Sequence, residues 1–295
     1  MNTDPEVYHA HVGFFARKSV RMRIQRIVAT LLILMGAGVV LVPFWWMIRT
    51  SLMSMGEAFL VPTHWYPRNV EWHNYIDAWR AAPFTQYTWN SVVVTFLSTV
   101  GTVFTASLTA FGFARLRAPG RDFLFMLILS SLMIPSIVVL VPTYLLFLKL
   151  GWIDTYLPLI VPYWLGGGAF SIFLLRQFFR GIPRDFDEAA TLDGASFFRI
   201  YWNIAVPLSL PAHAAVAIFA FFFHWNEFFG PLIYLNNSEK YTLPVGLSFF
   251  VKAYGVVQWN QLMAVTLVAM LPCIVVFFLA QRYFVEGITL TGVKG

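Results

Sequence analysis

Charged residues are scarce in this 295-residue sequence, where Asp, Glu, Lys and Arg make up only 12% of the positions. A soluble domain has about 25%, so the chain has too few charges to cover a water-soluble globule of this length. Hydrophobic residues account for 59% of the sequence, and 30 residues are Phe. The excess apolar surface needs lipid, which indicates an integral membrane protein.

Cysteine is nearly absent, because Cys273 is the single one. It excludes a disulfide framework and any metal cluster built on cysteine. The sequence also lacks G-x-x-x-x-G-K-[ST], G-x-G-x-x-G, H-E-x-x-H and G-x-S-x-G, the patterns of nucleotide-binding loops, zinc proteases and serine hydrolases. We therefore expect no ATP site, no metal site and no catalytic centre on this chain, and a protein that is not an enzyme.

Six stretches of more than 20 residues contain no charged residue at all. About 20 apolar residues in a helix cross a bilayer core roughly 30 Å thick. The sequence thus predicts an all-α integral membrane protein with six transmembrane helices, the first of which is too long for a signal peptide. The stretches are 27–48, 81–114, 123–148, 155–175, 200–226 and 253–281. For the two longest, we expect the transmembrane helices at about 90–113 and 262–284, where the sequence is most apolar.

Lys and Arg are distributed unequally between the two faces that these spans define. Fourteen of the 20 fall in the N-terminal segment, in the second-to-third and fourth-to-fifth connections, and after the last span. This asymmetry is a topology signal rather than a nucleic-acid footprint, and it predicts that both termini are cytoplasmic. We expect a multi-pass membrane protein.

The spans themselves lack the ionisable residues with which secondary transporters bind or relay a coupling ion. Glu227 lies only at the outer end of the fifth stretch, and His213 and His224 inside it could relay protons or could simply pack. An ATP-independent carrier and a membrane-embedded enzyme remain as less favoured alternatives. We expect the energy for any uphill transport to enter from outside the bilayer.

Two further segments have more than one interpretation. The outer connection 49–80 is rich in Trp and Tyr, which suits either a cap at the headgroup level or a docking surface for a soluble partner. The Gly166-Gly167-Gly168 run lies inside a span and indicates close helix packing or a kink.

The cytoplasmic connection 181–211 is unusually polar, and its residues predict a helix–turn–helix. Pro183 suits a first helical position, and three carboxylates complement the helix dipole in the opening turns. Gly194 can end this helix in the left-handed conformation, and Ser196 can cap the next. The segment is either a solvated connection or, given the thin face of Ala189 and Ala190, a helix that docks in a groove of another protein.

The same segment resembles the EAA motif of the membrane subunits of ABC importers. Glu188-Ala189-Ala190 is followed at the motif's spacing by Gly194, Ile204 and Val206-Pro207, where Val206 replaces the family's Leu. The sequence around Asp193-Gly194 is similar to that of sugar importers. Near the C-terminus, Tyr241-Thr242-Leu243, Val245-Gly246, Leu279–Arg282 and Gly287–Gly295 resemble the carbohydrate permeases of the maltose type.

This resemblance implies the type I permease architecture, with a basic N-terminal segment at 1–26, a six-helix permease domain at 27–286 and a tail at 287–295. Within the domain, the segment 181–207 would be the coupling helix region. The coupling residues would be Glu188, Ala189, Ala190, Asp193, Gly194, Ile204 and Pro207. In the tail, Gly287, Thr289, Gly292 and Lys294 would contact the ATPase.

The resemblance also implies a location in a bacterial or archaeal cytoplasmic (inner) membrane, and it implies partners. They would be a second homologous permease, a homodimeric or heterodimeric ATPase that binds ATP and Mg, an extracytoplasmic solute-binding protein and the lipid bilayer. The expected cargo is a sugar or oligosaccharide, with glycerol-3-phosphate or a charged oligosaccharide as the alternative because Arg49, Arg80 and Lys252 lie near span ends. Polar or aromatic candidates for the substrate path are Asn90, Ser91, Tyr163, Trp164, Trp225 and Asn226.

Overall fold

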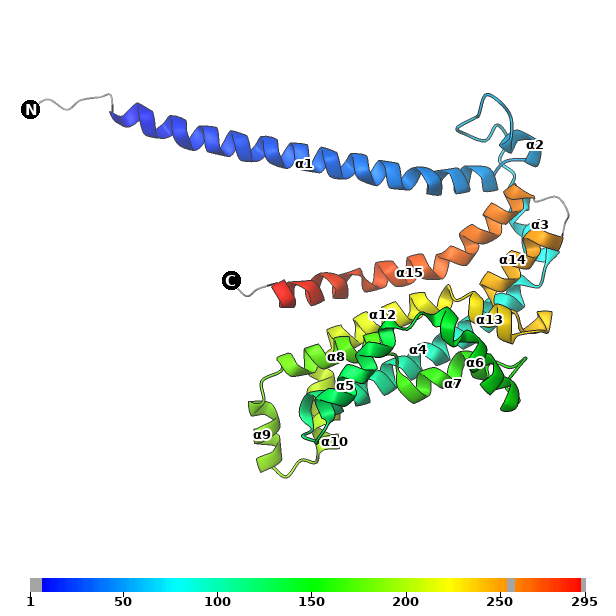
Figure 1. The fold of residues 1–295 in the computed structure, drawn as a ribbon. Helices are drawn as coiled ribbons and strands as arrows, with labels where there is room; N and C mark the ends of the chain where they lie inside the picture. The colour runs from blue at the N-terminus through cyan, green and yellow to red at the C-terminus, as the bar shows by residue number, and fades with distance from the viewer. Residues whose placement is uncertain (1–6, 254–257, 293–295) are drawn as a thin grey trace, which may run out of the picture.

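The computed structural model describes the backbone of residues 7–253 and 258–292 and the side chains of residues 22–250 and 258–281. Within these ranges the regular structure is helical throughout and contains no strand. Figure 1 shows a bundle of helices around α4, from which two long helices, α1 and α15, diverge. The expected all-α architecture is confirmed.

The helices follow one another with short connections. They are α1 (Val7–Ser51), α2 (Met55–Ala58), α3 (His73–Ala81), α4 (Phe84–Arg115), α5 (Arg121–Ser130), α6 (Ser136–Lys149), α7 (Leu157–Gly166), α8 (Ala169–Gly181), α9 (Asp185–Leu192), α10 (Phe197–Ile200), α11 (Val206–Leu208), α12 (Leu210–Trp225), α13 (Phe229–Tyr234), α14 (Leu243–Ala253) and α15 (Trp259–Gly292). A π-helical turn, Tyr201–Ala205, joins α10 to α11.

Four helical segments are long and apolar enough to cross a membrane alone: Met22–Ser51, Phe84–Arg115, Leu157–Gly181 and Trp259–Gln281. The other two predicted spans are each a bent pair of helices, Arg121–Met133 with Ser136–Lys149 at 101° and Phe197–Leu208 with Leu210–Trp225 at 79°. Pro135 and Ser209 lie at these two breaks. A proline lacks the backbone donor that would continue a helix, which accounts for the first bend.

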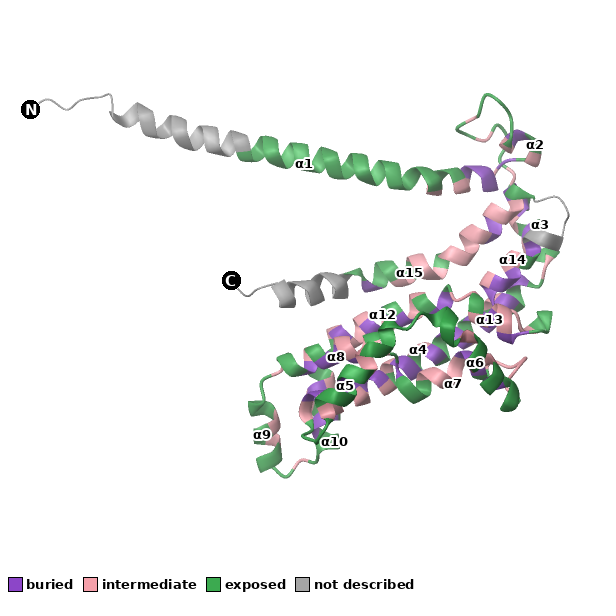
Figure 2. Cartoon of the chain, in the orientation of Figure 1, coloured by how far each residue is buried: buried purple, intermediate pink, exposed green. Residues whose placement is uncertain are grey.

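Helix α4 is the centre of the bundle and packs against α7, α8 and α12. In its most apolar window, 39% of the residues are buried, and Figure 2 shows buried positions along its length. Close approach depends on glycine. A Cβ atom on Gly101 would lie 2.6 Å from the Trp164 ring, and one on Gly167 would lie 2.4 Å from the backbone nitrogen of Ala106. Gly167 thus permits close helix packing, and the run also interrupts the helix, because Gly167 and Gly168 have positive φ between α7 and α8.

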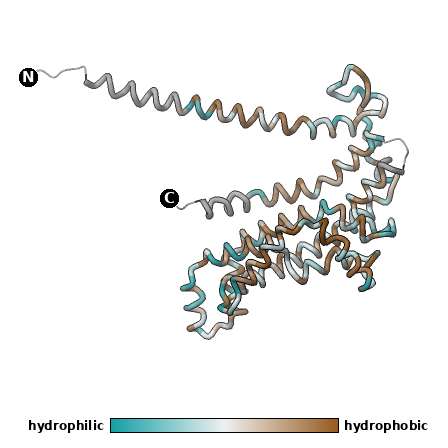
Figure 3. The backbone as a smooth tube through the Cα atoms, viewed as in Figure 1, coloured by the Kyte–Doolittle hydropathy of each residue, from teal (hydrophilic) through white to brown (hydrophobic). Residues whose placement is uncertain are grey.

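Helix α1 differs from α4, because none of its most apolar window is buried. It packs against α15, and Ser51, its last residue, is hydrogen-bonded to Asn74 and Tyr75 of α3. The rest of the helix extends away from the bundle (Figure 1), and hydrophobic residues cover much of its length (Figure 3). Only its C-terminal end is fixed. There Arg49 is 1% exposed, its Nε donates to the carbonyl of His64, and its guanidinium lies 4.3 Å from the Trp46 ring centroid.

Candidate functional site

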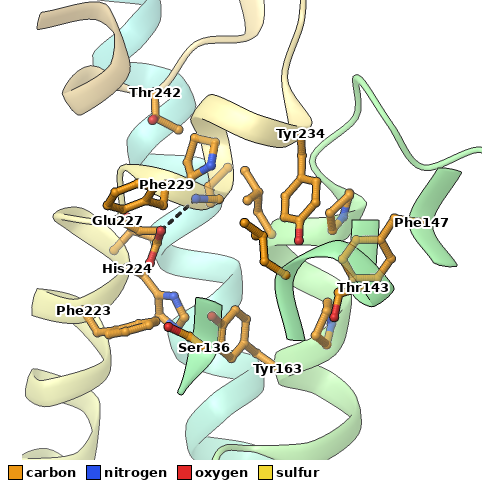
Figure 4. A pocket seen from close by; sticks show the side chains of 18 of the residues that line it. Ser136, Thr143, Phe147, Tyr163, Phe223, His224, Glu227, Phe229, Tyr234 and Thr242 are labelled. Atoms are coloured by element: carbon orange, nitrogen blue, oxygen red, sulfur yellow. Dashed lines mark hydrogen bonds between the residues drawn. The ribbon is translucent and has the colours of Figure 1, made fainter. Parts of the chain in front are cut away.

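A hollow of the bundle lies beside α4, where α6, α7, α12 and α13 converge (Figure 4). Its volume is about 590 Å³, which is sufficient for a small oligosaccharide or a comparable solute. Aromatic and aliphatic side chains make up most of the lining, with hydroxyl groups between them. The lining residues are Ser91, Val94, Thr95, Ser136, Ile137, Val139, Leu140, Thr143, Phe147, Pro158, Leu159, Pro162, Tyr163, Phe223, His224, Glu227, Phe229, Gly230, Pro231, Tyr234 and Thr242.

Glu227 supplies the only carboxylate of this cavity among the residues that the structure describes, and no Lys or Arg lines it there. One of its oxygens accepts a hydrogen bond from the backbone N–H of Gly230 at 2.9 Å, which holds the carboxylate at the start of α13. The remaining carboxylate lone pairs can accept hydrogen bonds from a ligand. The cavity therefore offers an acceptor of negative charge and no cation.

His224 and Tyr163 form the floor of the cavity in Figure 4. Their rings meet edge to face with centroids 4.3 Å apart, and His224 Nε2 lies 3.4 Å from the Thr102 hydroxyl. This hydroxyl partner and the close ring contact are typical of a packed histidine. They fit the packing interpretation of His224 better than a proton relay.

The rings of Tyr163, Phe223 and Tyr234 also border the cavity, together with the hydroxyls of Ser136 and Thr143 (Figure 4). Aromatic faces stack on the apolar faces of sugar rings, and hydroxyl groups both donate and accept hydrogen bonds. Chemically, the arrangement suits an uncharged, hydroxylated ligand.

The N-terminal end of α4 holds the segment that precedes α14 against the bundle. Asn90 donates to the carbonyls of Glu239 and Tyr241 at 2.8 and 2.9 Å, and the Ser91 hydroxyl accepts from the Leu243 N–H at 2.7 Å. Thr242 of this segment lines the cavity. The segment therefore forms part of the cavity wall and is fixed by α4.

An ion pair joins the connection between α6 and α7 to the connection between α13 and α14. Lys240 Nζ lies 2.7 Å from a carboxylate oxygen of Asp154, and the other oxygen accepts from the N–H groups of Asn236 and Asn237. The bond from Lys240, reinforced by the two backbone donors, lowers the pKa of Asp154 to about 2. This carboxylate therefore stays charged at any physiological pH.

Of the six residues predicted to line the substrate path, two line the cavity. Tyr163 and Ser91 line the cavity, whereas Asn90 binds the backbone described above. Trp164 donates to the carbonyl of Leu97, and Trp225 is buried and donates to the carbonyl of Ala269 on α15. The Asn226 amide bonds to the carbonyl of Phe222 one turn earlier.

Several lining residues were absent from the predicted set, among them Thr95, Ser136, Thr143 and Tyr234. They come from three different helices, α4, α6 and α13, and no local pattern relates them. The signal that the sequence does contain is Glu227, an isolated charge at the end of an uncharged stretch.

At the other end of α4, the polar connection folds into α9 and α10, as predicted. Gly194 adopts φ +79° after α9, and the Ser196 side chain accepts from the Arg199 N–H at the start of α10. Helix α9 begins at Asp185, two residues later than Pro183 suggested. It has no buried residue, and Glu188 and Ala189 are exposed. Figure 3 shows it as one of the most hydrophilic helices.

The other predicted coupling residues surround this helix. Asp193 is exposed and caps α9 through its backbone N–H, while Pro207 is exposed at the start of α11. Ala190 and Ile204 are half-buried and pack against the core cluster. The exposed face of the segment is therefore separate from the face that attaches it to the bundle.

An ion pair that the sequence does not reveal anchors α9 to α4. Arg115 Nε lies 3.0 Å from a carboxylate oxygen of Asp187, and Arg115 also donates to the carbonyl of Ile182 at 2.9 Å. Only 4% of the Arg115 side chain is exposed. The 72 residues that separate the partners explain why no local pattern reveals this pair.

Of the predicted tail, the structure includes the backbone only as far as Gly292, where α15 ends. Gly287, Thr289 and Gly292 are described only by their backbone, and Lys294 lies outside the described residues.

Three relatives of known assignment align with almost the whole chain. The arabinooligosaccharides transport system permease protein AraQ of Bacillus subtilis is 33% identical over 95% of this chain and 99% of its own length. The trehalose/maltose transport system permease protein MalG of Thermococcus litoralis is 31% identical, with the same coverage. The sn-glycerol-3-phosphate transport system permease protein UgpE of Yersinia enterocolitica is 32% identical over 87% of this chain and 93% of its own.

The fold is also that of a solved transporter. A chain in the crystal structure of a bacterial ABC transporter involved in the import of the acidic polysaccharide alginate superposes with a TM-score of 0.76. The two chains are 23% identical, and the alignment covers 89% of this chain and 97% of the other. Residues 102–290 match the family described as binding-protein-dependent transport system inner membrane component. The chain therefore belongs to this family of membrane-embedded transport subunits, the permeases of ABC importers.

Proposed function

We propose that this permease forms, with a second homologous permease, the path of a neutral sugar or oligosaccharide across the cytoplasmic membrane. A solute-binding protein delivers the sugar to the outer face. A separate ATPase dimer binds ATP and Mg and drives transport from the cytoplasmic face. In this arrangement the two bent helix pairs are spans, so that six spans cross the membrane and both termini are cytoplasmic.

The composition of the 590 Å³ cavity carries the proposal for the substrate. A sugar hydroxyl can donate to the Glu227 carboxylate, and hydrogen bonds to a charged group are about twice as strong as those between neutral groups. Tyr163 and Tyr234 offer ring faces and hydroxyls to the sugar. The cavity thus matches each feature of a neutral polyol.

An anionic substrate fits less well, although a relative is assigned to sn-glycerol-3-phosphate and a structural relative to alginate. A desolvated phosphate or carboxylate needs cationic partners, and the Glu227 carboxylate would repel it. Arg49 is buried at the end of α1, and Arg80 is exposed on α3, outside the cavity lining. The side chain of Lys252 lies outside the described residues.

For coupling, we propose that the exposed face of α9 sits in a cleft of the ATPase. Glu188 would pair with a basic group there, Ala189 and Ala190 would permit close approach, and Gly194 would set the turn. Asp193, Ile204 and Pro207 complete the segment, with Ile204 connecting it to the core. We further propose that the tail, with Gly287, Thr289, Gly292 and Lys294, contacts the two ATPase subunits.

Uptake by the complete transporter in proteoliposomes, with its binding protein outside and ATP inside, tests the substrate class. We expect uptake of a labelled neutral sugar and none of glycerol-3-phosphate. Glu227→Gln should lower sugar uptake about tenfold, the effect of one charge-assisted hydrogen bond. Glu239→Gln is the matched control, because this exposed acid lies near the same end and outside the cavity.

Two results would contradict the proposal. Uptake of glycerol-3-phosphate in place of the neutral sugar would favour the anionic alternative. Sugar uptake by the chain alone, without the ATPase or ATP, would indicate a secondary carrier.

A further inference from the structure

A second cavity, of about 390 Å³, lies at the opposite end of α4 and has the opposite charge. Five arginines and one acid contribute to its lining: Arg115, Arg121, Arg176, Arg180, Arg184 and Asp122. They come from the end of α4, the start of α5, the last turns of α8 and the residue before α9. No part of the proposed transport function uses this cavity.

Contacts with the surrounding helices hold the guanidinium group of Arg176 in place at the wall of the cavity. Arg176 is 7% exposed, and its guanidinium lies 3.9 Å from the centroid of the Phe125 ring. Its Nε donates to the Phe113 carbonyl at 3.3 Å, and its Nη2 lies 3.3 Å from Asp122 Oδ1. A ring contact of this kind orients the planar group and leaves part of its donor edge for another partner.

The positive charge of the cavity is not balanced by the acids that the structure describes. Asp122 is shared by Arg121 and Arg176, and Asp187 is paired with Arg115. Five guanidinium groups thus meet two carboxylates, which leaves a surplus of three positive charges. Arg180 and Arg184 are exposed and have no carboxylate partner in the part of the chain that the structure describes. The unpaired guanidinium groups therefore favour binding of an anion in this cavity.

An apolar surface continues from the cavity along α5. Phe123, Leu124 and Leu127 are 64%, 52% and 51% exposed, and they follow directly after Arg121 and Asp122. A soluble anion would make no use of this surface, whereas the acyl chains of a lipid would cover it. Basic pockets between membrane helices on the cytoplasmic side are suited to phospholipid head groups.

We propose that the five-arginine cavity binds a phosphate ester, that of an anionic phospholipid in the cytoplasmic leaflet. Arginine forks pair with phosphate oxygens two at a time, so that Arg180 and Arg184 can complete a site whose rear wall is Arg176. Because Arg115 pairs with Asp187 and Arg184 precedes α9, the headgroup would lie at the base of α9. The inference does not depend on which solute the permease carries.

Native mass spectrometry of the complete transporter tests the site, with phosphatidylglycerol and phosphatidylcholine as competing lipids. We expect the wild type to retain phosphatidylglycerol preferentially. Arg180→Gln combined with Arg184→Gln should weaken this retention about tenfold or more, because the change removes charge-assisted hydrogen bonds to the phosphate. Arg23→Gln combined with Arg26→Gln is the matched control, because these arginines are exposed on α1 at a distance from the cavity. It should change retention less than twofold.

The other outcomes would overturn the inference. Equal retention of the two lipids, or equal loss in both double variants, would mean that the cavity has no role in lipid binding. Stabilisation by millimolar inorganic phosphate without any lipid preference would assign the cavity to a soluble phosphate instead. Loss of the ATPase subunits from the cavity variant, with lipid retention unchanged, would assign the arginines to a protein contact.

Discussion

The two ends of α4 differ in what holds them. At the N-terminal end, which we propose to face the outside and call the outer end, side chains fix the neighbouring connections: Asn90 binds the segment before α14, and Asp154 binds Lys240 and two backbone N–H groups. At the C-terminal end, which we propose to face the cytoplasm and call the cytoplasmic end, α9 exposes Glu188 and Ala189, and the neighbouring cavity has three uncompensated positive charges.

This difference indicates where the chain depends on other molecules. An end whose connecting segments are held by hydrogen bonds within the chain can keep its shape and enclose a cavity for a passing solute. An end with an exposed helix and unpaired arginines gains its full stability only when a protein and lipid cover it. The same difference is expected of a transport subunit that receives its solute at one end and is moved by an ATPase at the other.

The largest expected effect comes from changing the cytoplasmic end. Glu188→Lys reverses an exposed charge, and Gly194→Pro prevents the φ of +79° that ends α9. Either change should abolish ATP-driven uptake, by more than tenfold, while the protein still inserts into the membrane. Uptake in proteoliposomes and the amount of inserted protein are the two measurements. Full uptake by either variant would break the proposed contrast between the ends.

The core between the two ends should respond in stability rather than in coupling. Gly167→Ala would place a Cβ atom 2.4 Å from the Ala106 nitrogen at a positive φ, and we expect a loss of about 2–5 kcal/mol. Gly166→Ala is the control, since a Cβ atom there has no neighbour within 4 Å. Thermal unfolding in detergent compares the two. Equal unfolding temperatures would show that α4 and α7 are not packed as described.

The smallest effect is expected at the ion pair between Asp154 and Lys240. Asp154 has a pKa of about 2, lowered by Lys240 and two backbone donors, so its contribution to stability is present above the ordinary carboxyl pKa near 4 and is lost as the pH falls toward 2. Because this pair is partly exposed, Asp154→Asn should lower the unfolding temperature by only about a degree or two at neutral pH. The difference between variant and wild type should vanish at the acidic end of a pH series. A constant difference down to the lowest pH would contradict the assignment.

Local features were predictable from the sequence. The uncharged stretches correspond to the long helices or bent helix pairs, and Gly194 and Ser196 have the turn and cap roles that their chemistry favours. The bends at Pro135 and Ser209 were missed because charge gaps measure length and not direction.

The sites were less predictable because they depend on contacts between distant residues. The cavity combines Thr95, Tyr163 and Tyr234 from three helices, and the Arg115–Asp187 pair joins α4 to α9. Asn90 and Trp225 illustrate the reverse case. They are polar or aromatic residues in spans, yet they bind backbone carbonyls.

The central claim is that the cytoplasmic end is completed by a partner ATPase through α9. The most direct test is the subunit composition of the complex purified in mild detergent with a tagged wild-type or Glu188→Lys chain. We predict one second permease and two ATPase subunits per wild-type chain, and loss of the ATPase but not of the second permease from the variant. A wild-type chain that purifies alone and still transports without ATP would contradict the account.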